Sequence, residues 1–224
     1  VTALRLKAYA DSRSTERIRT DKSTNESWEN TGEKMMFDTQ ELKLLRILEP
    51  TITWHIREAQ LTDAPALMQY CEMMAQQTPN NTSLRTYLLP ETVDGYRELI
   101  ATYVNHANST MFVVVDQDKI VGMIKVTGND HPLTGHIVEL SINIHPDYQG
   151  QRIGSVLMDK AIDWAKAHLG IRRIQLDVLA HNTDAIRFYE RRGFCIEGFR
   201  HRAYHLHDVD EPSDFDAFTM GLVL

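Results

Sequence analysis

Apolar and polar residues alternate in several short stretches of this chain. From Thr51 to Arg57 the apolar positions Ile52, Trp54 and Ile56 fall on one side, which predicts a half-buried strand. Similar β-rich runs predict further strands over residues 110–116, 119–128, 135–145, 172–179, 194–200 and 215–224. A short polar turn at residues 116–118 joins the first two of these runs, so we expect a hairpin there.

Between these strands the apolar residues follow a helical period. After Thr62, a predicted N-cap, they recur at helical spacing at Ala64, Leu67, Met68, Cys71, Met74 and Ala75. The methionines suit an adaptable binding surface, but the spacing favours a helix packed on a sheet. Residues 76–90 are polar and contain two prolines, which predicts a loop. Further helices are predicted over residues 91–106, 153–169 and 182–193, the second ending at Gly170 and the third capped by Asn182.

The order of these elements predicts the fold class and the domain limits. We expect an α+β domain at residues 51–224, a three-layer α/β arrangement whose mixed, mostly antiparallel sheet of six or seven strands has helices on both faces. Residues 1–35 are rich in Ser, Thr, Asn, Arg and Glu and have no apolar period. We therefore expect a disordered tail, a leader or an upstream extension there. Residues 36–50 predict a short helical lead-in that Pro50 stops.

Composition narrows the class of protein. The chain has 224 residues, 42% of them hydrophobic and 25% charged, which is typical of a globular domain. Its formal net charge of -7 gives no broad basic field, so we expect no nucleic-acid partner. No apolar run has the length of a membrane span, so we expect no membrane partner. Cys71 and Cys195 lack a disulfide or metal spacing, which indicates buried thiols and a cytoplasmic location.

The most informative local feature is the turn at residues 149–155, Gln-Gly-Gln-Arg-Ile-Gly-Ser. It lies between an apolar strand that ends near His145 and a helix that begins near Ile153. A small-residue turn in this place directs backbone N–H groups and the positive end of a helix dipole toward one point, which favours a phosphate or diphosphate. The turn has neither a P-loop Lys-Ser or Lys-Thr nor Gly-x-Gly-x-x-Gly. The predicted ligand therefore carries phosphates but is neither a hydrolysed nucleotide nor NAD.

Two sequence motifs lie on these predicted elements, one at the turn before the helix 153–169 and one in the helix 182–193. Residues 144–154 read Ile-His-Pro-Asp-Tyr-Gln-Gly-Gln-Arg-Ile-Gly, and residues 182–189 read Asn-Thr-Asp-Ala-Ile-Arg-Phe-Tyr, followed by Gly193 and Phe194. The first resembles the acyl-CoA pyrophosphate motif of the GNAT superfamily of N-acyltransferases, and the second resembles that family's next motif. The resemblance covers residues 52–224. It departs at Arg152, where the family has its first Gly, so this side chain must turn outward for the backbone to approach the diphosphate.

The resemblance implies an acetyl-CoA-dependent N-acetyltransferase with the acyl-CoA N-acyltransferase fold, with acetyl-CoA as co-substrate and no metal. In the family, the strand before the turn splays from its neighbour and its backbone contacts pantetheine. Ordinary strand pairing is the alternative for this strand, and a helix cap alone is the alternative for Asn182. The residues implied in acyl-CoA binding are Ile142, Asn143, Ile144, Gln149, Gly150, Gln151, Arg152, Ile153, Gly154, Ser155 and Asn182.

Two residues are implied in catalysis. Tyr189 matches the family position of a general acid that protonates the CoA thiolate, and the alternative is a packing role beside Phe188. Glu139 is a candidate general base because its apolar sequence neighbours would raise the pKa of its carboxyl group. The alternatives are a solvated strand face shared with Ser141 and Asn143, or a water chain in place of the base.

The predicted acceptor is a primary amine of a small molecule or a protein. We expect its pocket to combine the loop 76–90, the strand with Glu139 and the segment 200–207, and a homodimer is a further expectation. Two other functions remain: a CoA-binding regulatory module without turnover, and a tRNA-acetylating toxin of the same family, which the net charge of -7 disfavours. Three histidines lack a further ligand at fixed spacing, so surface or acceptor-site roles are expected rather than a metal: His201, His205 and His207.

Overall fold

A computed structural model describes residues 27–30, 33–36, 53–77, 89–206 and 213–224. The chain divides into two units, Val1–Thr53 and Trp54–Leu224. In the first unit, strands β1 (Ser27–Asn30) and β2 (Glu33–Met36) pair antiparallel. These strands fall almost wholly inside the segment 1–35, whose other residues lie outside the described residues. The predicted lead-in 36–50 also lies outside them beyond Met36, so both assignments stay predictions.

The second unit is built on a seven-stranded sheet in the order β3-β4-β5-β6-β7-β9-β8. All neighbouring strands pair antiparallel except β6 and β7, which are parallel. This confirms the predicted mixed, mostly antiparallel sheet. The strands are β3 (Trp54–Glu58), β4 (Thr110–Asp116), β5 (Lys119–Thr127), β6 (Ile137–Ile144), β7 (Arg173–Leu179), β8 (Cys195–Leu206) and β9 (Ser213–Val223).

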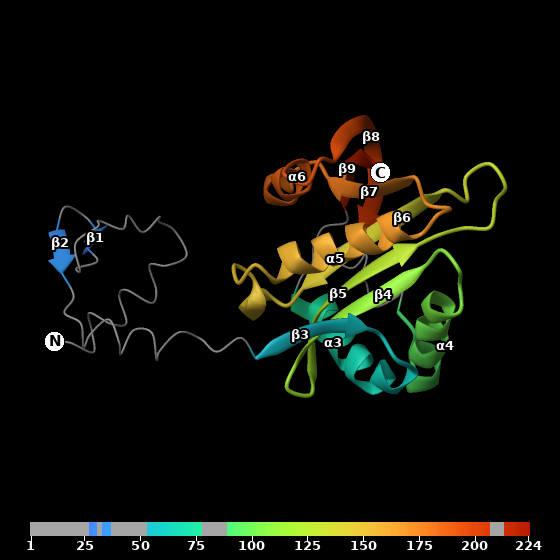
Figure 1. The fold of residues 1–224 in the computed structure, drawn as a ribbon, viewed down its shortest axis with the longest axis horizontal. Coiled ribbons are helices and arrows are strands. Elements are labelled where there is room, and N and C mark those ends of the chain that lie inside the picture. The colour runs from blue at the N-terminus through green and yellow to red at the C-terminus, as the bar shows by residue number, and fades with distance from the viewer. Residues whose placement is uncertain (1–26, 31–32, 37–52, 78–88, 207–212) are drawn as a thin grey trace. The chain divides into compact units, whose positions relative to one another are not determined.

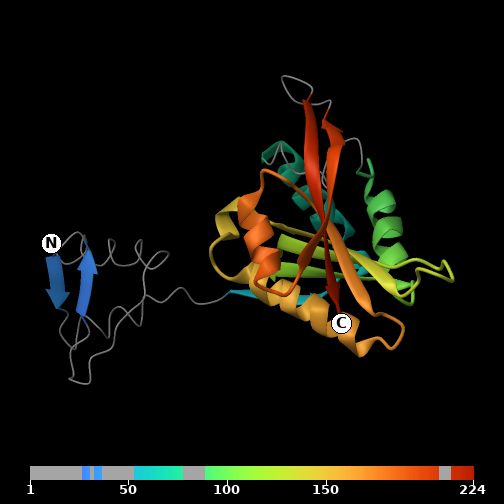
Figure 2. The ribbon, with the colours of Figure 1, turned by 90° about the horizontal axis from the view of Figure 1, so that it is seen from above.

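Helices cover the sheet on both faces and complete three layers (Figures 1 and 2). Helices α3 (Ala64–Gln77) and α4 (Val93–Val104) lie on one face, over β4 and β5. Helices α5 (Ile153–Ala167) and α6 (Thr183–Glu190) lie on the other. Short 3-10 turns precede α3 and α5, at η1 (Leu61–Asp63) and η3 (Pro146–Tyr148). The predicted three-layer architecture is therefore confirmed.

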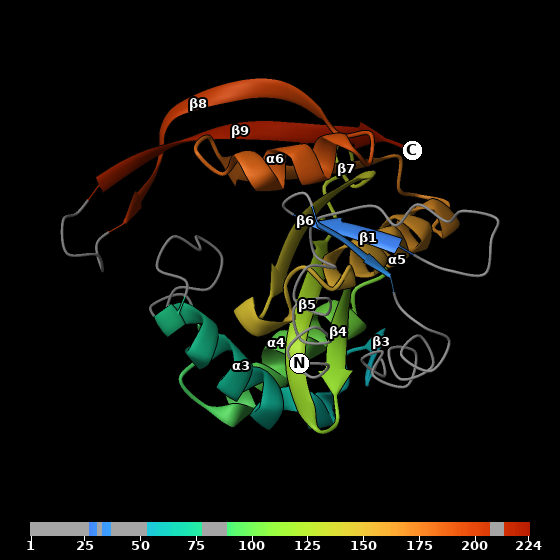
Figure 3. The same cartoon turned by 90° about the vertical axis from the view of Figure 1, so that its left-hand side faces the viewer.

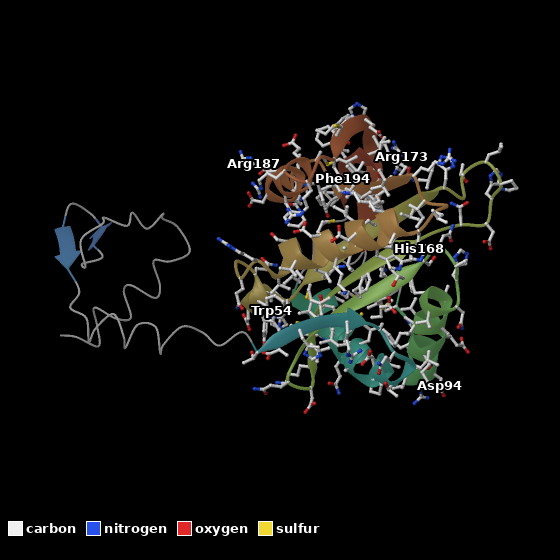
Figure 4. All side chains as sticks on the ribbon, viewed as in Figure 1. Trp54, Asp94, His168, Arg173, Arg187 and Phe194 are labelled. Carbon is white, nitrogen blue, oxygen red and sulfur yellow. The ribbon has the colours of Figure 1, made fainter. Side chains whose placement is uncertain are left out.

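Two apolar clusters hold these layers together, one on each face of the sheet. The α5 side buries Val138, Leu140, Ile174, Leu176 and Phe194 together with the apolar stripe of α5. Phe194 is labelled in Figure 4 and is 2% exposed. The α3 side buries apolar residues of α3 and α4 against alternate residues of β4 and β5: Leu67, Tyr70, Met74, Tyr96, Ile100, Met111, Val113 and Met123.

Several predicted boundaries lie a few residues from the observed ones, and α5, predicted to end at Gly170, ends at Ala167 with His168 as its C-cap. Two of the differences have a clear structural reason. Thr62 lies inside η1 and is not the N-cap, because the carboxylate of Asp63 accepts a hydrogen bond from Gln60 N at 2.7 Å and takes the capping role. Strand β8 continues to Leu206, beyond the predicted end at Arg200, because it pairs with β9 on both sides of an irregularity. In Figure 3 β8 and β9 run side by side as a long arm, away from α3 and α4.

Candidate active site

Strands β6 and β7 part midway along their length. They pair from Ile137 to Glu139 on β6 and from Arg173 to Gln175 on β7, and the pairing stops there although both strands continue. His145 N donates to Val121 O of β5, so the odd-numbered residues of β6 direct their backbone groups toward β5. Because the amides of alternate strand residues point to opposite sides, the N–H groups of Ile142 and Ile144 face the gap that β7 leaves. Residues 142–144 therefore lie where the family resemblance expects a splayed strand.

The turn after β6 presents a row of unpaired N–H groups at the start of α5. Gly150 and Arg152 have positive φ angles of 76° and 64°, which bend the chain sharply into the helix. Within the described residues, the backbone N–H groups of residues 150–154 donate to no protein acceptor, whereas Ser155 N donates to Arg152 O at 3.0 Å. Together with the dipole of the 15-residue helix α5, these groups have the arrangement that favours an anion.

Side-chain hydrogen bonds brace this turn against the strands. Gln149 Nε2 donates to Ile144 O at 3.2 Å, and Gln151 Nε2 donates to Asp147 O at 3.2 Å. Tyr148 Oη donates to Asp116 Oδ2 at 2.6 Å, which ties the turn to the end of β4 and raises the pKa of Tyr148. The two glutamines thus contribute to the shape of the turn, a role that the sequence motif did not indicate.

Arg152 occupies a backbone conformation that favours glycine. Its φ of 64° is in the left-handed region, and its side chain is exposed, as the outward orientation requires. This conformation accounts for the glycine that the family has at this position. Gly154, in contrast, would place an added Cβ 3.7 Å from Phe188, which is an ordinary contact, so this position has room for alanine.

Tyr189 lies on α6 and packs between two aromatic rings. The ring centroids of Phe188 and Phe194 are 5.4 and 5.8 Å from its own, and burial raises the pKa of its phenol to about 12. The packing alternative therefore describes a real contact, and the phenol stays protonated at neutral pH. Asn182 caps α6, since its Oδ1 accepts from Ala185 N at 3.1 Å, which leaves its amide nitrogen for another partner.

Glu139 is exposed, unlike the apolar surroundings that its sequence neighbours suggest. Val138 and Leu140 point into the cluster on the α5 side, so the Glu139 side chain points to the opposite face of the sheet. There its carboxylate accepts a hydrogen bond from Gln175 Nε2 at 3.2 Å. Glu139 and Tyr189 therefore lie on opposite faces of the sheet, because Tyr189 belongs to the cluster on the α5 side.

The strand that carries the gap is also anchored from the helix layer. Tyr70 of α3, which is 3% exposed, donates through its hydroxyl to Asn143 O at 3.0 Å. Asn143 itself is 7% exposed. The carbonyl of Asn143 and the N–H of Ile144 belong to one peptide group, so this hydrogen bond fixes the direction of an N–H that faces the gap.

A family model described as the acetyltransferase (GNAT) family matches residues 67–194, which is more than half of the chain. The chain belongs to the GNAT acetyltransferase family. The predictions of the family, of the acyl-CoA N-acyltransferase fold and of an N-acetyltransferase are thereby confirmed at the level of the family.

Individual relatives agree with this assignment. Spermidine N(1)-acetyltransferase of Vibrio cholerae is 28% identical over 123 residues, which are 53% of this chain and 70% of that protein. An acetyltransferase of the GNAT family from Streptococcus pneumoniae superposes with a TM-score of 0.71 at 28% identity, over 76% of this chain and 99% of the other. The yncA protein of Salmonella typhimurium, solved with its cofactor acetyl-CoA, shares the fold with a TM-score of 0.64 at 19% identity, over 76% and 94% of the two chains.

The relatives differ in the amines they are named for. Besides spermidine, these names include L-amino acids and peptidyl-lysine. The chain spans about two thirds of the length of the spermidine acetyltransferases it matches. The GNAT family thus fixes the class of reaction and leaves the acceptor open.

The structure adds polar residues near the gap that the sequence did not single out. Asp177 of β7 lies on the same face as Glu139 and Gln175, two residues beyond the last β6–β7 pair. Tyr204 of β8 reaches Asp177 across β9. The alternation of β7 could have indicated Asp177. Tyr204 lies beyond the predicted end of its strand but within the segment 200–207 that was predicted to line the acceptor pocket. Residues 78–88 of the predicted acceptor loop lie outside the described residues.

The histidines of the β8–β9 arm face carboxylates. His201 Nδ1 is 3.7 Å from Asp216 Oδ2, and His205 Nδ1 is 2.6 Å from Asp214 Oδ1. In the described part of the chain, His, Cys, Asp and Glu side chains do not gather in groups of three or more that would hold a metal ion. His207 lies outside that part.

Proposed function

We propose that this GNAT protein transfers an acetyl group from acetyl-CoA directly to a primary amine. One observation supports the proposal above all: two sets of free backbone N–H groups follow each other along the chain. They are the open edge of β6 at Ile142 and Ile144 and the unpaired N–H groups of residues 150–154. The first suits the extended amide chain of pantetheine, which can pair along a free strand edge, and the second suits a diphosphate.

The binding roles follow from the chemistry of these groups. The N–H groups of Gly150 to Gly154 would hold the diphosphate oxygens, and the exposed Arg152 guanidinium would add charge-assisted contacts. The N–H groups of Ile142 and Ile144 would hold the amide carbonyls and the thioester carbonyl. The free amide nitrogen of Asn182 would add a contact from α6.

Acetyl-CoA supplies an activated acyl group with a thiolate leaving group. The amine approaches from the face that carries Glu139, which accepts the proton that the nitrogen must lose before it attacks. The N–H that faces the gap stabilises negative charge on the carbonyl oxygen. A C–N bond forms, the C–S bond breaks, and Tyr189 on the other face gives its proton to the departing sulfur. The bonded nitrogen loses its second proton to water, and water returns a proton to the Tyr189 oxygen. The proposed acid, Tyr189, and the proposed base, Glu139, thus act on different atoms from opposite faces of the sheet.

Thermal unfolding with and without acetyl-CoA tests this proposal. A ligand that binds the folded state raises its stability by about 2.7 kcal/mol at a hundred times its Kd, so the melting temperature should rise. Gly154→Glu places a negative charge beside the diphosphate and should abolish the rise. Gly170→Glu adds the same charge after α5, where an added Cβ meets nothing within 4 Å, and should preserve it.

Turnover separates this proposal from a CoA-binding module. An amine panel with acetyl-CoA should release CoA only when an acceptor amine is present. Binding without release of CoA for any amine would favour the regulatory module, and a missing melting shift would contradict both readings.

A further inference from the structure

Half of one sheet face carries polar side chains. On the α3 side of the sheet, α3 and α4 pack on β4 and β5. On the same face of β6 to β9 lie the residues that alternate along each strand with those pointing into the apolar cluster of the α5 side. Glu139 and Asp177 on this face are exposed. The face borders the β6–β7 gap and therefore lies where an acceptor would meet the thioester of the proposed function.

Asp177 is the centre of a hydrogen-bond network on this face. Its Oδ1 accepts from Thr219 Oγ1 of β9 at 2.7 Å. Its Oδ2 accepts from Tyr204 Oη of β8 at 3.3 Å and from the guanidinium of Arg200. Three donors from two other strands therefore hold this carboxylate, and Arg200 balances its charge. Asp177 is suited to fix a neighbour rather than to bind a cation by itself.

The neighbour that it fixes is the hydroxyl of Tyr204. A phenol hydroxyl has one proton, and Tyr204 donates it in the hydrogen bond to Asp177. The lone pairs of its oxygen therefore remain to accept hydrogen bonds. Burial and the Asp177 carboxylate raise the pKa of Tyr204 against the opposing charge of Arg200, so its hydroxyl keeps its proton. Glu139 accepts from Gln175, and Tyr204 donates to Asp177, which lies two residues further along β7 on the same face. An anionic and a neutral oxygen acceptor are therefore held at neighbouring positions of β7 beside the gap.

A primary ammonium group matches this pair. It carries a positive charge and three N–H donors, so it can bind the Glu139 carboxylate and the Tyr204 oxygen at once. Lys125 of β5 pairs in register with Ser141 on the far side of β6. Its like charge disfavours an ammonium on that side, whereas on the side of β7 and β8 the charge of Arg200 is paired with Asp177.

We propose that Tyr204, held by Asp177, binds the ammonium group of the acceptor together with Glu139. Tyr204 is then a specificity-determining residue and Asp177 a positioning residue that acts through it. This inference rests on the proposed function, since it locates the acceptor of that reaction.

Steady-state kinetics of two variants test the inference with the amine that wild-type protein uses best. Tyr204→Phe keeps the ring and removes one hydrogen bond to a charged group, so the KM for the amine should rise about tenfold. Asp177→Asn should raise it in the same direction. Because Asp177 acts through Tyr204, the double variant should be no worse than Tyr204→Phe alone. The KM for acetyl-CoA and its melting shift should stay at wild-type values in all three.

Glu197→Gln is the matched control. Glu197 lies on β8 and pairs with Arg173 at the paired end of β7, and Figure 4 labels Arg173. This variant removes a charge from the same face without touching the Asp177 network, so the KM for the amine should not change. A KM in Tyr204→Phe equal to that of Glu197→Gln would overturn the inference, as would an equal rise in the KM values of both substrates. Wild-type protein without an acetyl-CoA shift would instead overturn the proposed function, and this inference with it.

Discussion

At the scale of single residues, the proposed mechanism gives Tyr189 a proton-transfer role in addition to its observed packing. Burial raises its pKa to about 12, so it is protonated whenever a thiolate leaves. The same burial disfavours a thiolate anion nearby, which supports proton transfer despite the high pKa. Phe188 and Phe194 hold the ring, so a variant without the hydroxyl should fold normally.

We therefore expect Tyr189→Phe to lower turnover by about 10²-fold while the affinity for acetyl-CoA changes little. The loss should appear equally in kcat and kcat/KM, because the proton is needed in the transition state and not in the ground state. Rapid kinetics with the preferred amine measure both constants. Wild-type rates in this variant would assign Tyr189 to packing alone.

Arg152 combines backbone strain with a favourable charge. A non-glycine residue at a φ of 64° costs about 1 kcal/mol, and Arg152 belongs to the turn that is proposed to bind the diphosphate. Arg152→Gly should therefore raise the free energy of unfolding by up to about 1 kcal/mol and weaken acetyl-CoA binding. Arg152→Ala keeps the strain and should weaken binding without the gain in stability. Denaturant unfolding and titration calorimetry measure the two effects, and identical stabilities of the two variants would contradict the strain argument.

At the scale of elements, an ion pair secures the entry into α3. Burial alone would raise the pKa of Asp63, but hydrogen bonds from Arg57, at 2.6 and 2.7 Å, and from Gln60 N outweigh it and lower the pKa. A lowered carboxyl pKa means that the folded state prefers the charged form. Its stabilisation is therefore present above the ordinary value of 3.8 and disappears as the pH falls through the lowered value.

Asp63→Asn should then cost about 1–2 kcal/mol of stability at pH 7, a figure kept low because the Arg57 side chain is 32% exposed. The difference from wild type should shrink as the pH falls below 3.8. Urea unfolding at a series of pH values measures it. A difference that is constant with pH would show that the carboxylate charge has no part in the effect.

Most helices and strands could be predicted from the sequence, because the spacing of apolar residues that indicates them lies within a short stretch of the chain. The turn at residues 149–155 was predicted as an anion site, since a strand, a small-residue turn and a helix are neighbours in the chain. The exposure of the Glu139 side chain was harder to predict. Its neighbours in the sequence are apolar, but in a strand they point to the opposite face of the sheet and do not surround it. The second half of β8 carries His201, Arg202 and His205, which obscure the alternation, and pairing with β9 defines it instead. The Asp177 network joins three strands that only the folded sheet brings together.

At the scale of the whole catalytic unit, the parting of β6 and β7 connects the two faces of the sheet. The anion-binding turn and Tyr189 belong to the α5 side, and Glu139 and Asp177 belong to the α3 side. A sheet with continuous pairing would separate these groups by a layer of backbone. In the proposed mechanism the gap lets a thioester from one side meet an amine from the other, as direct transfer without a covalent enzyme intermediate requires.

The catalytic unit should also be sufficient for stability. The described members of both apolar clusters, and the strands and helices that supply them, lie between Trp54 and Leu224. Burial of apolar surface is the main source of folding free energy, and residues 1–34 show no periodic apolar face in the sequence. We therefore expect deletion of residues 1–34 to leave the melting temperature and its acetyl-CoA shift nearly unchanged.

Deletion of residues 1–58 is the matched control for this experiment. It also removes β3 and with it Arg57, whose guanidinium pairs with Asp63, and it exposes the edge of β4 that β3 covers. An unpaired strand edge and a broken ion pair should lower the melting temperature strongly or prevent soluble expression. Equal, large losses for both deletions would show that residues 1–34 pack on the catalytic unit or on a second copy of the chain. Size-exclusion chromatography of the full chain and of the shorter deletion would then decide between these two explanations, because only packing between copies changes the elution volume with concentration.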